Sequence, residues 1–146
     1  MTKSMADFPD VNVWVALTAE DHALHHRADV YWHSEADRSL RFCRTTALGL
    51  VRVTSHKLTF GGEPMAPHEA WENYLRWRAR PEVELVPEPA GIEQVISSWC
   101  RDGLATPRNW TDLYLAAFAV SAELRLVTFD RDFRNFPGLK LLHLEI

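Results

Sequence analysis

The sequence lacks several features that define whole classes of protein. It has only two cysteines, Cys43 and Cys100, far apart and in no metal-ligand spacing, so we expect two reduced, partly buried thiols. No apolar stretch approaches the roughly 18 residues that a membrane helix needs. The first ten residues, MTKSMADFPD, contain no apolar core of a signal peptide. These absences predict a cytoplasmic protein with no membrane partner.

An excess of positive charge is also missing. The formal net charge of the 146 residues is −4, which argues against bulk, charge-driven binding of nucleic acid. Nucleic acid itself is not excluded, because a carboxylate site that holds cations counts as acidic while a basic rim contacts phosphate. The length fits one domain over residues 1–146, and no repeat or low-complexity segment is visible.

Short apolar runs alternate with longer segments of helical periodicity. This alternation predicts an α/β fold in which helices cover a short, mostly parallel central sheet. We expect Asp21 and Thr111 to cap two of the helices, and Thr45 or Thr46 a third. The expected strands are 5–9, 39–44, 83–86, 124–129 and 139–146; the expected helices are 11–17, 21–35, 47–53, 67–80, 91–101 and 112–122.

Aspartates stand at three junctions between these segments. Asp10 follows the first strand in FPDVN, Asp112 opens a very apolar helix in WTDLYLAA, and Asp130 with Asp132 follows the strand in LVTFDRDF. Each has a structural explanation. Asp10 can cap a helix, Asp112 is stabilised by the helix dipole in a first turn, and Asp130 is a common turn residue. In a parallel α/β sheet, however, the carboxyl ends of the strands share one edge. We therefore expect the aspartates to converge on one pocket.

A convergence of carboxylates suits a hard divalent cation such as Mg²⁺ or Mn²⁺, which prefers oxygen ligands. Two neighbouring polar residues fit supporting roles. Asn12 could orient a metal-bound water or a carboxylate, and Thr128 could donate a hydrogen bond to a ligating carboxylate.

With these residues in place, the chain resembles the PIN-domain family, and within it the VapC-type toxins of bacterial type II toxin–antitoxin pairs. The matching segments are FPDVNVWVAL, NWTDLYLAAFA and LRLVTFDRDF followed by a short terminal strand, in the same order and at similar separations. The resemblance spans nearly the whole chain. It implies a three-layer α/β/α fold with a short parallel sheet.

The resemblance also implies a function. Members of this family are Mg²⁺- or Mn²⁺-dependent endoribonucleases, and the motifs place Asp10, Asp112 and Asp130 as metal ligands and catalytic acids, with Asp132 as an auxiliary acid. A VapC-like protein is expected to have a VapB-like antitoxin and often a homodimer contact. The implied substrate is structured RNA of the tRNA or rRNA class, cut in a single-stranded loop, with inhibition of translation as the consequence.

One position departs from the family pattern. The family usually carries a glutamate in the helix after the second strand, whereas the matching segment here reads TTALGLVRV and Gly49 takes the glutamate position. The departure leaves open whether the site binds one metal ion or two.

Basic and aromatic residues elsewhere offer further candidates. Arg52, Arg76 and Arg78 could form a basic rim for RNA phosphate, although a solvated face explains them equally well. The helical stripe of Trp71, Tyr74 and Trp77 is more typical of packing on the sheet than of a partner surface. The histidines of HALHH, residues 22–26, favour a solvated helix face over a metal site.

Two other functions stay open from the sequence. The chain could be a non-catalytic PIN-like module that binds RNA or protein, weakened at the site by Gly49. An acid-pocket phosphatase is less favoured, because the segment around Asp10 has no second nearby acid.

Overall fold

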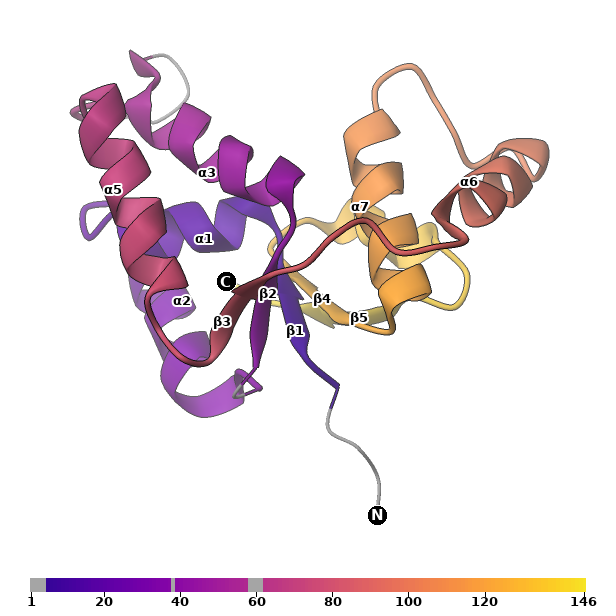
Figure 1. Cartoon of the computed structure of the whole chain (residues 1–146), viewed down its shortest axis with the longest axis horizontal. Coiled ribbons are helices and arrows are strands. Elements are labelled where there is room, and N and C mark those ends of the chain that lie inside the picture. Colours follow the sequence, from indigo (N-terminus) through magenta and orange to yellow (C-terminus); the bar gives the residue numbers. More distant parts are fainter. Residues whose placement is uncertain (1–4, 38, 58–61) are drawn as a thin grey trace.

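The computed structural model describes residues 5–37, 39–57 and 62–146. Five strands form one sheet in the order β3-β2-β1-β4-β5, so the first strand lies at its centre (Figure 1). All four strand pairings are parallel, which places every carboxyl end at one edge of the sheet. The strands are β1 (Asp7–Pro9), β2 (Leu40–Phe42), β3 (Val83–Leu85), β4 (Arg125–Thr128) and β5 (Lys140–His143).

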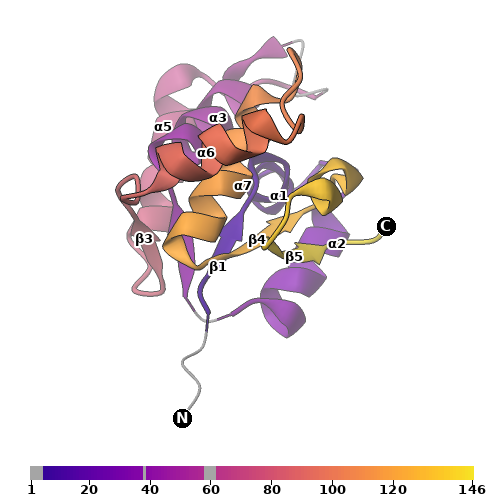
Figure 2. The same ribbon diagram turned by 90° about the vertical axis from the view of Figure 1, so that its right-hand side faces the viewer.

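Helices cover both faces of this sheet, as the views in Figures 1 and 2 show. One face carries α1 (Val11–Thr18), α2 (His25–Val30), the π-helical turn η1 (Tyr31–Glu35), α3 (Arg44–Ser55) and α5 (Pro67–Arg78). The other carries α6 (Ile92–Arg101), α7 (Trp110–Ala122) and the 3-10 turn η2 (Arg131–Asn135). The three-layer α/β/α architecture expected from the sequence is confirmed.

Each face of the sheet has its own apolar core. Trp14 of α1 stacks on Phe42 of β2, with ring centroids 4.0 Å apart. On the opposite face Phe8 stacks on Phe118 of α7 at 5.0 Å. Because α7 is apolar on nearly all sides, it lies enclosed between the sheet and α6, with its first turn beside the carboxyl edge.

Several expected boundaries and caps differ from the structure. The helix expected over 21–35 is α2 followed by a π-helical turn; Leu24 precedes α2, so Asp21 does not cap it. Helix α7 begins at Trp110, one residue before Thr111, which therefore lies inside the helix. At α3 the N-cap is Cys43 and not Thr45 or Thr46; the backbone N–H of Cys43 donates to the Thr46 hydroxyl at 3.0 Å.

The amino end of β1 is held by a buried ion pair. Asp7 has no exposed surface, and its carboxylate accepts from the Arg125 guanidinium at 2.8 and 3.0 Å and from the Tyr31 hydroxyl at 2.6 Å. The backbone N–H of Asp37 adds a fourth hydrogen bond at 3.0 Å. This cluster ties β1, β4 and η1 together at the edge opposite the carboxyl ends of the strands.

No helix within the described ranges is long and apolar enough to cross a membrane.

Candidate active site

Asp10 occupies the junction between β1 and α1, at the centre of the carboxyl edge. It is the N-cap of α1, and its Oδ1 accepts from the backbone N–H of Val11 at 2.7 Å. Its Oδ2 accepts from the Thr128 hydroxyl at 2.9 Å. The capping role expected for Asp10 is therefore confirmed, and its second carboxylate oxygen lies at the edge where a functional site is expected.

Asp130 follows the neighbouring strand, β4, two residues after its last residue, Thr128. Its backbone N–H donates to the Thr128 hydroxyl at 3.0 Å, and its Oδ1 accepts from the backbone N–H of Asp132 at 2.8 Å. The buried hydroxyl of Thr128 thus bridges the two strand ends, donating to Asp10 and accepting from Asp130. The hydrogen bond from Thr128 to a carboxylate that the sequence predicted is present.

Asp112 reaches the same place from the first turn of α7. Burial, and after it the negative charges of Asp10, Asp130 and Asp132 in that order, together raise the pKa of its carboxyl to about 6. Charges act on a carboxyl in this way only at close range. The aspartates named from three distant segments therefore influence one another electrostatically at this edge of the sheet.

The electrostatics of this region are those of uncompensated carboxylates. Burial raises the pKa of Asp10, and the charge of Asp130 adds to the effect, while the hydrogen bonds from Thr128 and Val11 oppose it. Across the described ranges, no three His, Cys, Asp or Glu side chains are gathered tightly enough to hold a metal ion as they stand. The aspartates instead accept hydrogen bonds from neutral neighbours.

Asn12 and His143 hold the backbone behind the site. Asn12 makes a long contact of 3.5 Å between its Oδ1 and the backbone N–H of Phe129. The Nε2 atom of His143 lies 3.1 Å from the carbonyl oxygen of the same residue. Together they fix the turn that presents Asp130. No local pattern marks His143, because its contact depends on β5 pairing with β4.

Gly49 lies against the start of α1 and not in open space. A Cβ atom at this position would meet Cγ2 of Val11 at 2.5 Å, closer than packed carbon atoms tolerate. Val11 follows Asp10 in the sequence, so Gly49 packs against the residue next to Asp10. A larger side chain there would require Val11 to move.

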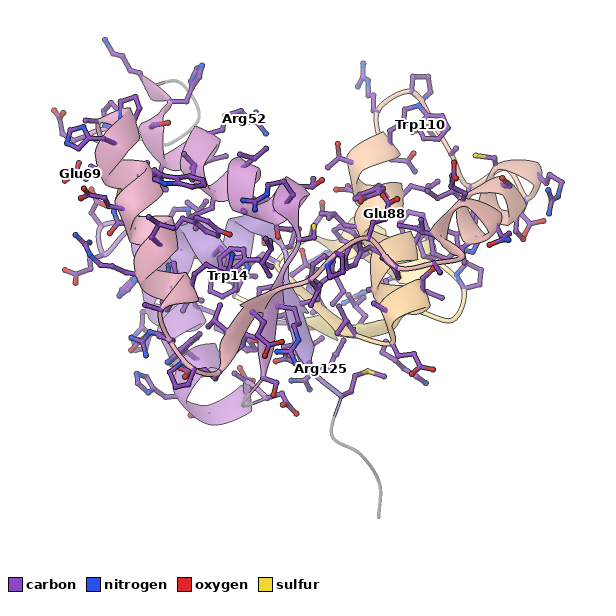
Figure 3. The ribbon with its side chains drawn as sticks, viewed as in Figure 1. Trp14, Arg52, Glu69, Glu88, Trp110 and Arg125 are labelled. Carbon is purple, nitrogen blue, oxygen red and sulfur yellow. The ribbon has the colours of Figure 1, made fainter. Side chains whose placement is uncertain are left out.

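The three arginines proposed as a basic rim are not gathered at the aspartates. Arg76 and Arg78 belong to the last turn of α5, which leads into the amino end of β3, at the opposite edge of the sheet. Arg78 donates to the Tyr74 hydroxyl at 2.8 Å, and Arg76 to Asn73 Oδ1 at 2.6 Å. Arg52 is exposed in the last turn of α3, as Figure 3 shows.

A different arginine lies closer to the aspartates. Arg44 was expected to end the second strand, but β2 stops at Phe42 and Arg44 is the exposed first residue of α3. It therefore sits at the carboxyl edge, beside the strand that carries Asp10. The expected strand ended two residues too late, which hid the position of Arg44 at the start of α3.

The donor set fits a hard divalent cation. Asp10, Asp112 and Asp130 offer only oxygen ligands, and no compensating cationic group is hydrogen-bonded to them among the described residues. A bound Mg²⁺ or Mn²⁺ would neutralise the mutual repulsion that raises the pKa of Asp10 and Asp112.

Comparison with known proteins agrees with this geometry. Residues 8–139 match the model of the PIN domain family. The chain is 33% identical over 138 residues to ribonuclease VapC41 of Mycobacterium tuberculosis, covering 90% of this chain and 94% of that protein. It is 32% identical over 139 residues to ribonuclease VapC44 of the same species, covering 92% and 94%.

Solved structures share the fold at lower identity. The sarcin-ricin loop cleaving toxin VapC20 of M. tuberculosis superposes with a TM-score of 0.68 at 17% identity, over 92% of this chain and 99% of that one. A chain of the DNA-bound VapBC complex of Salmonella typhimurium gives 0.65 at 18% identity, over 97% and 100%. Fold, motif order and sequence identity agree: this chain belongs to the PIN-domain family and, within it, to the VapC ribonucleases.

Proposed function

We propose that this chain is a Mg²⁺- or Mn²⁺-dependent endoribonuclease and the toxin of a toxin–antitoxin pair. The proposal is supported by the positions of Asp10 and Asp130 after neighbouring strands and by the raised pKa of Asp10 and Asp112, to which the charge of Asp130 contributes. Carboxylates kept close together against their own repulsion are typical of sites that act through a cation.

The residues have separate tasks in this chemistry. Asp10, Asp112 and Asp130 would hold the metal, which when bound supplies a nucleophilic water and neutralises charge on the phosphate. Thr128 keeps Asp10 and Asp130 in fixed relative positions through its two hydrogen bonds. Asp132 adds negative charge at the rim, and Asn12 steadies the turn that carries Asp130.

The names of the relatives support the finer parts of the proposal. VapC20 is a sarcin-ricin loop cleaving toxin, and other structural neighbours were solved as VapBC complexes. We infer that this chain cuts structured RNA of the tRNA or rRNA class in an unpaired loop, which would inhibit translation. A VapB-like antitoxin would hold it inactive by covering the aspartates, and a homodimer is the accompanying assembly.

Cleavage of RNA by the purified chain tests the proposal. We expect hydrolysis with Mg²⁺ or Mn²⁺, none with EDTA, and reduction to background in Asp10→Asn and Asp112→Asn. Asp102→Asn is a matched control, because Asp102 is an exposed acid at the end of α6. Full activity in either site variant, with an unchanged fold by circular dichroism, would remove the proposed site.

A non-catalytic binding module is the second candidate. Gly49 favours it, because the chain lacks the glutamate usual in the family and the position is blocked by Val11. Calorimetric titration with Mn²⁺ separates the two functions. Mn²⁺ binding that disappears in Asp10→Asn supports the nuclease. A wild-type protein that does not bind Mn²⁺ and does not cut RNA supports the binding module.

A further inference from the structure

A pocket next to the aspartates has chemistry that the cleavage reaction does not use. Its volume is about 340 Å³, within the range of small-molecule sites. Three segments form it: the end of β2, the chain that leaves β3, and the exposed side of α7. We call it the side pocket, and its lining includes Cys43, Arg44, Pro87, Glu88, Tyr114 and Phe118.

The side pocket continues the line of strand ends on which the aspartates lie. Across the carboxyl edge the order is β4, β1, β2 and β3, which brings Asp130, Asp10, Arg44 and Glu88 in turn. Neighbouring strands are about 4.8 Å apart, so the side pocket begins one to two strand spacings from Asp10. That separation suits the nucleotide next to a phosphate held at the aspartates.

The lining offers the groups that recognise an unpaired base. The Tyr114 hydroxyl donates to Oε1 of Glu88 at 2.7 Å, which orients the ring, and because Glu88 is exposed its second carboxylate oxygen is accessible to a ligand. A carboxylate oxygen accepts from the exocyclic amino group of cytosine, as glutamate does in other complexes. Arg44, exposed at the lip, supplies positive charge for the adjoining phosphate.

A second aromatic residue extends the surface. Trp110 is 52% exposed and precedes Tyr114 by four residues, so both project from the same side of α7. Figure 3 shows Trp110 at the N-terminal end of that helix, and Glu88 beside the helix on the chain segment that crosses it. Two aromatic side chains one helical turn apart form a platform on which successive bases can stack.

The arrangement also restricts the form of the RNA. Asp112 is two residues from both Trp110 and Tyr114, so helical geometry directs it to the other side of α7. A strand that touches the aspartates and the side pocket must bend around the first turn of this helix. A continuous duplex cannot follow that path, whereas an unpaired loop can.

We propose that the side pocket and Trp110 bind unpaired bases of the RNA, with Tyr114 stacking on the base next to the cut and Glu88 selecting bases that carry an exocyclic amino group. The proposal rests on the proposed nuclease function for its direction, but it concerns binding and not hydrolysis. Binding is therefore tested without metal.

Fluorescence anisotropy with a labelled single-stranded hexanucleotide in EDTA measures this binding. Because stacking on one aromatic residue contributes a factor of about ten, we expect Tyr114→Leu and Trp110→Leu each to weaken binding about tenfold. Trp71→Leu is the matched control, since Trp71 is 40% exposed on α5, away from α7 (Figure 1), and we expect no change. Tyr114→Phe keeps the ring, and should bind within about twofold of the wild type.

An abasic nucleotide provides the complementary change in the RNA. When the abasic nucleotide is placed at each position of the hexanucleotide in turn, it should weaken binding to the wild-type protein at one or two positions. At those positions it should cause no further weakening of binding to Tyr114→Leu. Glu88→Gln should reduce the preference for cytosine over uracil at the same position. If thermal melting shows that Tyr114→Leu fails to fold, the abasic series with Trp110→Leu and Tyr114→Phe still tests whether the side pocket binds bases.

The outcomes separate this proposal from the nuclease function. Unchanged RNA binding by folded Tyr114→Leu and Trp110→Leu, with no effect of abasic positions, overturns the side pocket even if the wild type cuts RNA. The surface would then belong to a protein partner. Base-dependent binding that is lost in these variants upholds it even if the wild type cuts nothing.

Discussion

The two ends of β1 carry one aspartate each, and the molecule treats them in opposite ways. Asp7, at the amino end, is fully buried and accepts four hydrogen bonds, two of them from the cationic Arg125. Asp10, three residues later, accepts one hydrogen bond from a hydroxyl and one from a backbone N–H, and its charged neighbours are acids.

Asp7, which stabilises the fold, and Asp10, which we propose binds metal, are only about ten ångströms apart along the chain. At Asp7 a guanidinium compensates the buried charge, and the same contact raises the pKa of Arg125. At Asp10 no protein cation compensates it, so burial raises the pKa of the carboxyl and the strand end stores unfavourable energy. A carboxylate satisfied within the protein is a structural group, whereas one that is left uncompensated among other acids is available to a metal.

The same substitution, Asp to Asn, should change the stability of the protein most differently at these two positions. Asp7→Asn removes the charge opposite Arg125, and breaking a buried pair costs about 3 kcal/mol, at the low end because Arg125 keeps 32% of its side-chain surface exposed. Asp10→Asn removes repulsion, so the metal-free protein should be as stable as the wild type or more so by about 1 kcal/mol. Urea unfolding in EDTA measures both. Equal losses at the two positions would contradict the assigned roles.

Metal should stabilise only through the carboxyl edge. At a Mn²⁺ concentration one hundred times the dissociation constant, the wild type should gain about 2.7 kcal/mol of stability. Asp7→Asn should gain the same amount from its lower starting point, and Asp10→Asn should gain nothing. Thermal melting with and without Mn²⁺ shows this directly. A gain retained in Asp10→Asn would place the ion elsewhere.

The pH dependence of the metal-free protein should carry the mark of Asp112. Its pKa of about 6 in the folded state lies above the ordinary value near 3.9, so between these values the folded protein holds a proton that the unfolded chain has released. Stability from this residue therefore falls as the pH rises from about 4 to 6, and is level above that.

We expect a fall of roughly 1.5 kcal/mol, reduced for solvent screening because Asp112 is only partly buried. The difference in unfolding free energy between the wild type and Asp112→Asn isolates it from other titrating groups. A difference that is constant from pH 4 to 7 would show that Asp112 titrates normally.

The smallest effect concerns the bridge between the two strand ends. Thr128→Val removes the donor to Asp10 and the acceptor of Asp130 while keeping the shape of the side chain, and should cost about 1 kcal/mol. Thr54→Val is the control, since the buried Thr54 hydroxyl donates only to carbonyls of its own helix. Mn²⁺ affinity should fall in Thr128→Val and not in Thr54→Val. Equal affinity in both would remove Thr128 from the site.

Sequence was sufficient for the parts of this molecule that local patterns determine. The layers follow from alternating runs, and Asp10, Asp112 and Asp130 were selected because each follows a strand or opens a helix at a position that a parallel sheet brings to one edge. The aromatic stripe of α5 packs inward as expected at Tyr74 and Trp77.

What sequence missed depends on contacts between distant residues. The pair of Asp7 and Arg125 spans 118 positions, and nothing local marks either residue. The approach of Gly49 to Val11 requires knowledge of how α3 crosses α1. The arginines of α5 were misleading, because charge alone does not tell which edge of the sheet a helix end reaches.

Diffraction from crystals grown with Mn²⁺, recorded at a wavelength where manganese scatters anomalously, tests the central claim most directly. Anomalous density should appear with carboxylate oxygens of Asp10, Asp112 and Asp130 at about 2.1 Å, and the number of peaks would show whether Gly49 leaves the site with one ion or two. Density held by other residues, or none at this edge of the sheet, would contradict the account.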